Sequence, residues 1–159
     1  TASPNRFKQM IDLYEKLDGS ILPCIELTKD DDYLRYGVVR GEEIEKNVRR
    51  VEEIVEKPGK TNAPSKMASV GGYLLTPEVF EYVERALTHL PDDDEFYLTT
   101  YVLEPMIKDG LSLFGCALSD SHYYDTGNKL EYLKTIVDFA MKHQDIKEDF
   151  SNYLRSVVS

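Results

Sequence analysis

Three short segments carry residues whose types and spacing could do chemistry, and the first is "VEKP". Glu56 and Lys57 follow an apolar, β-branched stretch that Pro58 closes. A carboxylate can accept hydrogen bonds from two sugar hydroxyls, and an adjacent ammonium can meet a phosphate as a point charge. Consecutive strand residues point to opposite faces, so both can serve one ligand only if the strand ends there and Pro58 turns the chain. The alternative interpretation is a solvated surface pair.

The second segment is "SVGGYLL", which contains Gly71 and Gly72. Glycines inside a strand either accommodate a bulge or let a flat ligand contact the peptide groups closely. The residues alone leave both interpretations open.

The third segment is "YYDTGNKLEYL", in which Asp125 precedes a Thr-Gly turn and Asn128 precedes a long amphipathic run. One interpretation is that Asp125 or Asn128 only caps the following helix. The other is that Asp125 binds Mg²⁺ beside a helix N-terminus that also favours phosphate. No other catalytic pattern competes, because the three histidines are scattered and the chain has no GxGxxG or Walker A loop.

Composition excludes several classes of function. The 159 residues carry a formal net charge of -10 and show no basic stripe, so binding to nucleic acid or to anionic membrane surfaces is not expected. The longest apolar runs are far shorter than the roughly 20 residues that span a bilayer, and no signal peptide is visible. Cys24 and Cys116 lie far apart in apolar surroundings without metal-ligand spacing, which predicts buried free thiols in a cytoplasmic protein.

The strands that must position these segments are indicated by short β-branched runs. They are expected over 20–27, where Pro23 indicates an edge or a bulge, over 36–39 with an end at Gly41, over 68–75 and over 111–118. The segment 42–56 is ambiguous, because its valines recur at helical spacing whereas its end fits a strand closed by proline. We favour a strand for the last part.

Helices are indicated by apolar periodicity and by start and stop residues. The first begins at Ser3-Pro4 and stops at Asp18-Gly19. A second begins at Thr76-Pro77 and runs through Ala86 or Leu87, and a third spans 91–110 with a kink at Pro105 and a stop at Gly110. Two more are expected over 128–143 and around 150–157. This alternation predicts a single domain over residues 1–159, an α/β fold whose mostly parallel or mixed sheet is flanked by helices.

Taken in order, the segments resemble one family. "YGVV", "VEKP", "APSKMASVGGYLLTPEVF", "DEFYLTT" and "DTGNKLEYLKTIVDFAMKH" resemble the bacterial UTP–glucose-1-phosphate uridylyltransferases, and the resemblance runs from about Pro4 to the C-terminus. The "GNK" after the aspartate looks more like this family than like the related thymidylyltransferases. The resemblance implies the C-terminal part of a glycosyltransferase-A-like (Rossmann-like) nucleotidyltransferase fold, with a mixed sheet flanked by helices.

The resemblance also implies an activity and site residues. Members of the family join UTP and glucose 1-phosphate to give UDP-glucose and pyrophosphate with Mg²⁺. By position, Glu56 would bind glucose hydroxyls and Lys57 the sugar phosphate, while Asp125 would hold Mg²⁺; Lys57 and Asp125 would be the catalytic residues. The rest of the sugar pocket would be formed by Tyr36, Gly37, Val70 and Gly71.

The chain departs from the family in one large respect. Family members begin with a glycine-rich "GxGTR" loop that holds the nucleotide phosphates and later carry a second Mg²⁺-binding aspartate, and this chain has neither. We therefore expect a C-terminal fragment that lacks the N-terminal nucleotide-binding half, its partner, and that is inactive alone. A sheet edge exposed by that loss would favour a homo-oligomer. Thymidylyl or cytidylyl transfer stays open, as does a non-catalytic binding or assembly module of the same fold.

Overall fold

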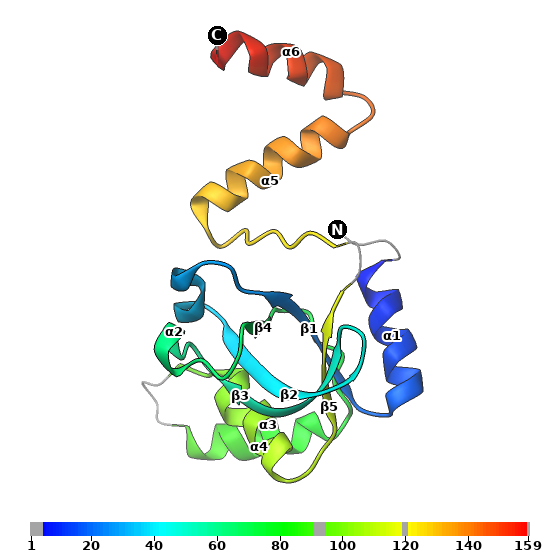
Figure 1. The fold of residues 1–159 in the computed structure, drawn as a ribbon, viewed down its shortest axis with the longest axis vertical. Helices are drawn as coiled ribbons and strands as arrows, with labels where there is room; N and C mark the ends of the chain where they lie inside the picture. Colours follow the sequence, from blue (N-terminus) through cyan, green and yellow to red (C-terminus); the bar gives the residue numbers. More distant parts are fainter. Residues whose placement is uncertain (1–4, 91–94, 119–120, 159) are drawn as a thin grey trace. The chain divides into compact units, whose positions relative to one another are not determined.

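The computed structural model describes residues 5–90, 95–118 and 121–158, and Figure 1 shows its elements. The chain divides into two compact units, Thr1–Ser121 and His122–Ser159.

The second unit consists of two helices, α5 (Lys129–Lys142) and α6 (Lys147–Val158). None of its residues 122–157 is buried. Because a domain has a hydrophobic core of its own, this unit is not a domain by that criterion, and the single domain over residues 1–159 stays a prediction.

The first unit contains all the strands of the described residues. They are β1 (Ser20–Glu26), β2 (Gly37–Glu45), β3 (Val48–Val55), β4 (Met67–Ser69) and β5 (Leu113–Ala117). The helical segments around them are α1 (Arg6–Leu17), the 3-10 turn η1 (Asp30–Leu34), α2 (Gly59–Asn62), α3 (Val79–His89), the π-helical turn η2 (Thr99–Leu103) and α4 (Glu104–Lys108). None of the helices in residues 5–90, 95–118 and 121–158 has the length and the apolar character needed to span a membrane.

The strands pair in the closed order β1-β4-β2-β3-β5. Within the described residues only β1 and β5 run parallel, and the other four pairs are antiparallel. The mixed sheet is therefore confirmed. Every strand has two neighbours, but β3 pairs with β5 only over Val48–Arg50, so the expected exposed sheet edge stays a prediction. Register shifts in β2 at Arg40/Gly41 and Glu43/Glu45 explain the closure, since bulges bend a strand and increase its twist.

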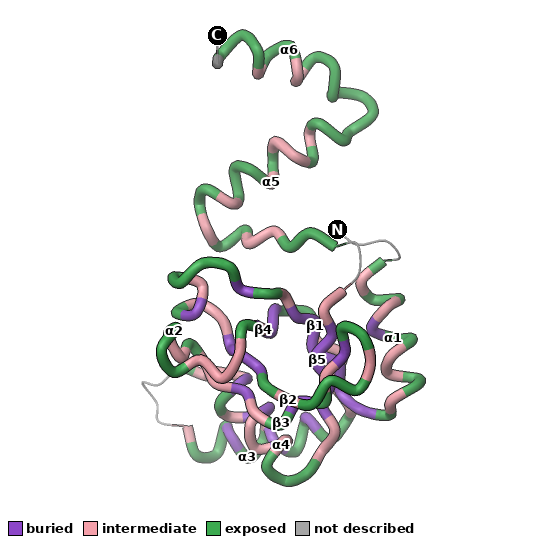
Figure 2. Tube along the Cα trace, in the orientation of Figure 1, coloured by how far each residue is buried: buried purple, intermediate pink, exposed green. Residues whose placement is uncertain are grey.

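The sheet carries apolar residues on both faces, and Figure 2 shows burial concentrated on the strands. One face packs against α3, η2 and α4, and its buried members include Leu22, Cys24, Ile54, Tyr82, Leu103, Met106 and Leu113. The other face packs against α1 through Met10, and its sheet residues are Ile21, Val48, Phe114 and Cys116. The α/β layering expected from the sequence is thus present.

Pro23 lies inside β1 rather than on an edge strand. Ile21 exchanges two backbone hydrogen bonds with Leu74, and the Pro23 carbonyl accepts from the Val70 N–H at 2.9 Å. Alternate residues of a strand direct their backbone groups to the same side, so Pro23 presents its nitrogen, which lacks a hydrogen, to the segment between Val70 and Leu74. That segment leaves the ladder, which is why proline is tolerated there.

Two predicted strands have the wrong length: the second is longer than expected and the one over 68–75 is shorter. β2 does not end at Gly41 but runs to Glu45 and joins β3 through Asn47, whose φ is 66°. The ambiguous segment is therefore a hairpin of strands, and the helix alternative is wrong. The strand expected over 68–75 ends at Ser69, because Gly72 adopts a left-handed φ of 98°, and only Leu74 returns as an isolated bridge to Ile21.

Helix predictions differ mainly at the first turns. The start signal Ser3-Pro4 lies outside the described residues, and Asn5 caps α1 by accepting from the Phe7 N–H. α3 begins at Val79, after a turn in which the Val79 N–H donates to the Thr76 carbonyl. The helix predicted over 91–110 begins only at η2; its part over 91–94 lies outside the described residues.

The cap of α5 is Asn128 and not Asp125. The Asn128 side-chain oxygen accepts from the N–H groups of Leu130 and Glu131 at 3.0 and 3.1 Å. The Asp125 carboxylate instead accepts from the Gly127 N–H at 3.0 Å within the preceding turn. Capping is therefore excluded as the role of Asp125.

The two cysteines are buried free thiols, as predicted. Cys116 pairs with Pro23 in the parallel ladder, so Cys116 and Cys24 point to opposite faces of the sheet. Burial raises the pKa of both thiols, that of Cys116 to about 11. A disulfide between them is excluded by this geometry.

We predict that replacing Gly41 by alanine destabilises the first unit. An added Cβ would lie 1.8 Å from the Arg50 carbonyl oxygen, so the β2–β3 hairpin must separate, at a cost of about 3 kcal/mol. Gly71→Ala is the matched control, because nothing lies within 4 Å of its added Cβ. Urea unfolding of both variants measures the difference, and equal midpoints would contradict the packing at Gly41.

We also predict that neither thiol of the native protein reacts with a disulfide reagent at pH 8. Both thiolates are scarce at that pH because burial raises their pKa. Both should react after unfolding in guanidinium chloride. Spectrophotometric thiol counting measures this, and a rapidly reacting native thiol would show that one face of the sheet is open.

Candidate sugar-phosphate site

The end of β3 places Glu56 and Lys57 on one side of the chain. β3 ends at Val55, and Lys57 adopts a left-handed φ of 43°. The Lys57 N–H still donates to the Tyr36 carbonyl at 3.2 Å, so the strand ladder is kept while the side-chain alternation is broken. The Lys57 ammonium and the Glu56 carboxylate therefore lie 4.0 Å apart. The turn needed for both to serve one ligand is present, and it occurs at Lys57 itself, one residue before Pro58.

Glu56 lies against the first residue of β2. A Cβ added to Gly37 would be 3.1 Å from Glu56 Oε2 and 3.4 Å from the Thr99 side chain. A side chain at this position would therefore press on the carboxylate, which glycine leaves undisturbed. Gly37 is paired with Ser69 of β4, so Val70 follows directly beside it. The structure thus brings Tyr36, Gly37, Glu56, Lys57 and Val70 to one place in the first unit.

The Gly71-Gly72 segment is partly occupied by the protein itself. The Arg6 guanidinium donates to the Gly71 carbonyl at 3.2 Å, and a Cβ added to Gly72 would lie 2.6 Å from it. The glycines therefore do allow a close approach, and the group that approaches Gly72 is the side chain of Arg6. Because the Val70 N–H is bound to Pro23, a ligand at this segment is left with the Val70 carbonyl and the Gly71 N–H.

Two residues of this cluster, Tyr97 and Thr99, are not indicated as site residues by the sequence. Thr99 is buried against Gly37. The Lys57 ammonium lies 4.4 Å from the centroid of the Tyr97 ring and 3.4 Å from its phenolic oxygen. Both residues belong to "DEFYLTT", a stretch quoted for the family resemblance without any role. No local pattern marks them, because their contacts are with residues some 40 to 60 positions earlier in the chain.

Electrostatic shifts fit a shared ligand site. The pKa of Lys57 is raised, chiefly by its hydrogen bond to Tyr97 and also by the carboxylates of Glu56 and Glu95. Burial raises the pKa of Tyr73, to which the nearby Glu56 charge adds. The Glu56 side chain is 20 % exposed and that of Lys57 41 %, so the ammonium is open to a ligand from solvent while the carboxylate is mostly sheltered.

Asp125 belongs to the second unit. In the described parts of the chain, no group of three or more histidine, cysteine, aspartate and glutamate side chains could hold a metal ion. Asp125 as a metal ligand therefore stays a prediction. A single carboxylate is nevertheless compatible with Mg²⁺, which usually keeps several waters and is bound through one or two carboxylates and substrate phosphates.

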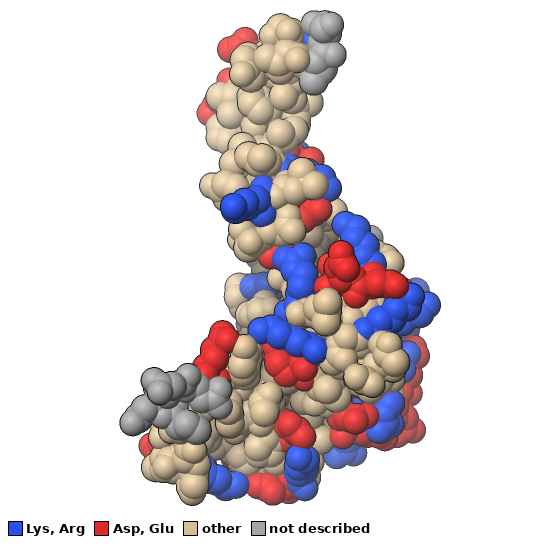
Figure 3. All heavy atoms as spheres, turned by 90° about the vertical axis from the view of Figure 1, so that its left-hand side faces the viewer, with Lys and Arg blue, Asp and Glu red and all other residues tan. Residues whose placement is uncertain are grey.

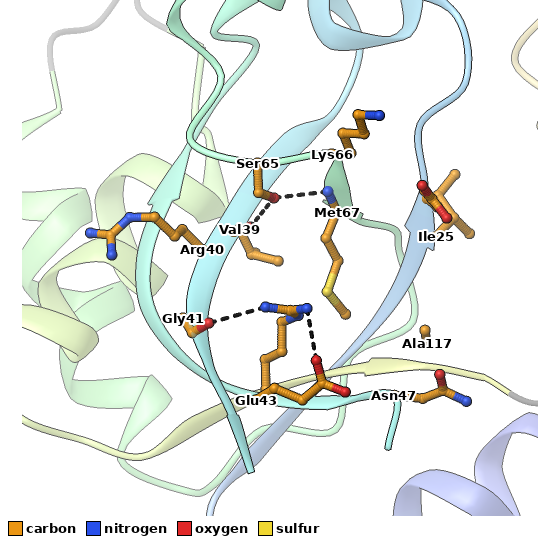
Figure 4. Close-up of a pocket in the computed structure, with 12 residues that line it drawn as sticks. Ile25, Val39, Arg40, Gly41, Glu43, Asn47, Ser65, Lys66, Met67 and Ala117 are labelled. Carbon is orange, nitrogen blue, oxygen red and sulfur yellow. Dashed lines mark hydrogen bonds and ion pairs between the residues drawn. The ribbon is translucent and has the colours of Figure 1, made fainter. Parts of the chain in front are cut away.

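A hollow of about 420 Å³ opens elsewhere in the first unit, between β1, β2 and β4 (Figure 4). None of the predicted site residues lines it. Its Arg49 donates to the Gly41 carbonyl and pairs with Glu43, both contacts being about 3 Å long. On the face shown in Figure 3 acidic and basic side chains are likewise interspersed.

Comparisons with known proteins identify relatives of the whole chain. The UTP–glucose-1-phosphate uridylyltransferase of Streptococcus pneumoniae serotype 4 is 34 % identical to this chain. The match covers 92 % of this chain and 48 % of that protein. A protein of the same name from Staphylococcus epidermidis is 30 % identical over 94 % of the chain and 50 % of its own length. The chain thus spans about half the length of the curated relatives it matches.

Solved structures give the same result. A UDP-glucose pyrophosphorylase complexed with UDP-glucose is 30 % identical and covers 86 % of the chain with a TM-score of 0.73, the match taking in 49 % of that protein. An Acinetobacter baumannii UDP-glucose pyrophosphorylase is 24 % identical with a TM-score of 0.76 over 96 % of the chain and 50 % of its own length, and it shows the shared fold. The profile of the family described as "Nucleotidyl transferase" matches residues 2–142. The chain belongs to the nucleotidyl transferase family.

Proposed function

We propose that this chain is the sugar-phosphate-binding part of an enzyme that transfers a uridylyl group from UTP to glucose 1-phosphate, giving UDP-glucose and pyrophosphate. The observation that carries the proposal is the turn at Lys57, which sets an ammonium 4.0 Å from the carboxylate of Glu56 beside Gly37. The names of the relatives, UTP–glucose-1-phosphate uridylyltransferase, support the choice of substrates.

The reaction joins two anions. A phosphate oxygen of glucose 1-phosphate attacks the α-phosphorus of UTP, and the bond from that phosphorus to the bridging oxygen breaks as pyrophosphate leaves. There is little covalent work for a side chain to do, so catalysis depends on positioning and on charge neutralisation. In this proposal Lys57 binds the sugar phosphate and lowers the repulsion between the two anions.

The other site residues hold the sugar. The carboxylate of Glu56 accepts hydrogen bonds from glucose hydroxyls. The missing side chain of Gly37 leaves room for that carboxylate, and the Val70 carbonyl and Gly71 N–H supply peptide contacts to the sugar. Tyr36 contributes its backbone, which fixes Lys57.

Asp125 would hold Mg²⁺ in this proposal. When bound, the ion neutralises phosphate charge and orients the phosphates. Asn128 supplies the helix cap, so the Asp125 carboxylate is not needed for that purpose.

The proposal needs a partner half. The chain has no glycine-rich phosphate loop, so the chain by itself is expected to bind glucose 1-phosphate without forming UDP-glucose. Thymidylyl or cytidylyl transfer would use the same residues, and testing UTP, dTTP and CTP with a nucleotide-binding half present distinguishes them. A homo-oligomer stays a prediction that sedimentation can check.

We predict that Lys57→Ala weakens the binding of glucose 1-phosphate to this chain by about ten- to a hundredfold, the range expected for losing a charge-assisted hydrogen bond. Isothermal titration calorimetry measures the affinity. Lys60→Ala is the matched control, because Lys60 is a neighbouring exposed lysine paired with Asp30. Equal losses in the two variants would show that only the general charge of this surface matters.

We also predict that Asp125→Asn lowers turnover at least about a hundredfold when the chain is assayed with a nucleotide-binding half. Asparagine keeps an oxygen that can accept from the Gly127 N–H, so circular dichroism and the melting temperature should hardly change. Asp145→Asn, an exposed change in the same unit, is the control. Retained activity in Asp125→Asn would show that Asp125 is not a metal ligand.

A further inference from the structure

Tyr97 makes two contacts with the Lys57 ammonium. The nitrogen lies over the ring, 4.4 Å from its centroid, and 3.4 Å from the phenolic oxygen. An ammonium over an aromatic face is attracted by the ring quadrupole. One residue thus supplies both a face and an oxygen to the same cation.

The structure holds Tyr97 itself in place. Its carbonyl accepts from the Tyr101 N–H at 2.9 Å, which begins the helical turn η2. On one side Phe96 stacks on the Tyr101 ring with centroids 5.9 Å apart, and two residues later Thr99 is buried against Gly37. The Tyr97 ring is therefore attached to a segment that is anchored on both sides.

Glu95 sets the direction of the phenol. The Tyr97 hydroxyl donates a hydrogen bond to the Glu95 carboxylate, so the lone pairs of the phenolic oxygen are left to accept from Lys57. The pKa of Tyr97 is raised, chiefly by this bond to Glu95. The Glu95 carboxylate, the neutral Tyr97 phenol and the Lys57 ammonium thus form a row in which each group attracts the next.

A lysine needs such a support if it is to bind phosphate at a defined point. Its ammonium ends a flexible four-carbon stem, and confining an exposed stem costs conformational entropy. Here the backbone turn fixes only the start of that stem. We propose that Tyr97 is a positioning residue that holds the Lys57 ammonium beside Glu56, ready for the phosphate of a sugar 1-phosphate.

This role rests on the proposed function and leaves the cation available to a ligand. An ammonium has three hydrogen-bond donors, and the phenolic oxygen takes one of them. The remaining donors can meet phosphate oxygens, since the Lys57 side chain is 41 % exposed. Positioning and phosphate binding are therefore compatible at the same nitrogen.

The test compares Tyr97→Phe and Tyr97→Leu in this chain, with glucose 1-phosphate and inorganic phosphate as probes. Phenylalanine keeps the ring and should weaken binding about twofold, whereas leucine removes ring and oxygen and should weaken it about five- to tenfold. Tyr153→Leu, an exposed tyrosine of the second unit, is the control. Tighter binding in Tyr97→Phe would overturn the proposal, because Tyr97 would then compete with phosphate for the ammonium.

A spectroscopic measurement separates positioning from a general structural role. With ¹³C-labelled lysine, the Lys57 ε-carbon signal is assigned by its loss in Lys57→Arg and titrated with pH. The pKa of Lys57 is raised mainly by Tyr97, so Tyr97→Phe should move it down towards its ordinary value. An unmoved pKa in Tyr97→Phe would overturn the proposal even if binding had weakened.

The two proposals fail in different ways. If Lys57→Ala leaves glucose 1-phosphate binding unchanged, the sugar-phosphate site is wrong. If Lys57→Ala weakens binding but Tyr97→Leu does not, the site stands and the positioning role of Tyr97 is wrong.

Discussion

The candidate site depends on one backbone conformation, the left-handed turn at Lys57. A residue with a Cβ pays about 1–2 kcal/mol to adopt it. The hydrogen bond from the Lys57 N–H to Tyr36 and the contact with the Tyr97 ring are stabilising interactions that offset this cost. If Lys57 continued the strand, its ammonium would point to the face opposite Glu56 and no single ligand could reach both groups.

The shape of the sheet places the turn at Lys57 beside the start of β2. β3 pairs with β5 only through its first three residues, Val48–Arg50, and with β2 along nearly its whole length. A strand shared between two neighbours in this way must twist and bend, and the bulges of β2 around Gly41 allow it. Gly37 at the start of the same strand then leaves space for the Glu56 carboxylate. Two glycines of β2 thus serve different purposes, one for closure of the sheet and one for the site.

What the sequence predicts well is local. Three features follow from neighbouring residues. They are the strand before "VEKP", the end of α4 just before Gly110, and the Asn128 cap of α5. What it misses involves contacts far apart in the chain. Arg6 lies 65 residues from the Gly71 carbonyl that it binds, and Tyr97 lies 40 residues from Lys57. Neither contact leaves a periodic signal, whereas the order of the motifs was enough to indicate the family.

The Arg6 contact also limits which backbone groups the proposed site could offer to a sugar. Of the backbone groups at Val70 and Gly71, one N–H is bound to Pro23 and one carbonyl to Arg6. The remaining carbonyl and N–H offer one acceptor and one donor, which matches a hydroxyl that both donates and accepts. Glu56, as a carboxylate, only accepts. In the proposed site a sugar would therefore be bound by hydroxyl donors towards Glu56 and by a mixed pair at the Val70-Gly71 peptide, and a ligand without hydroxyl groups would leave both unsatisfied.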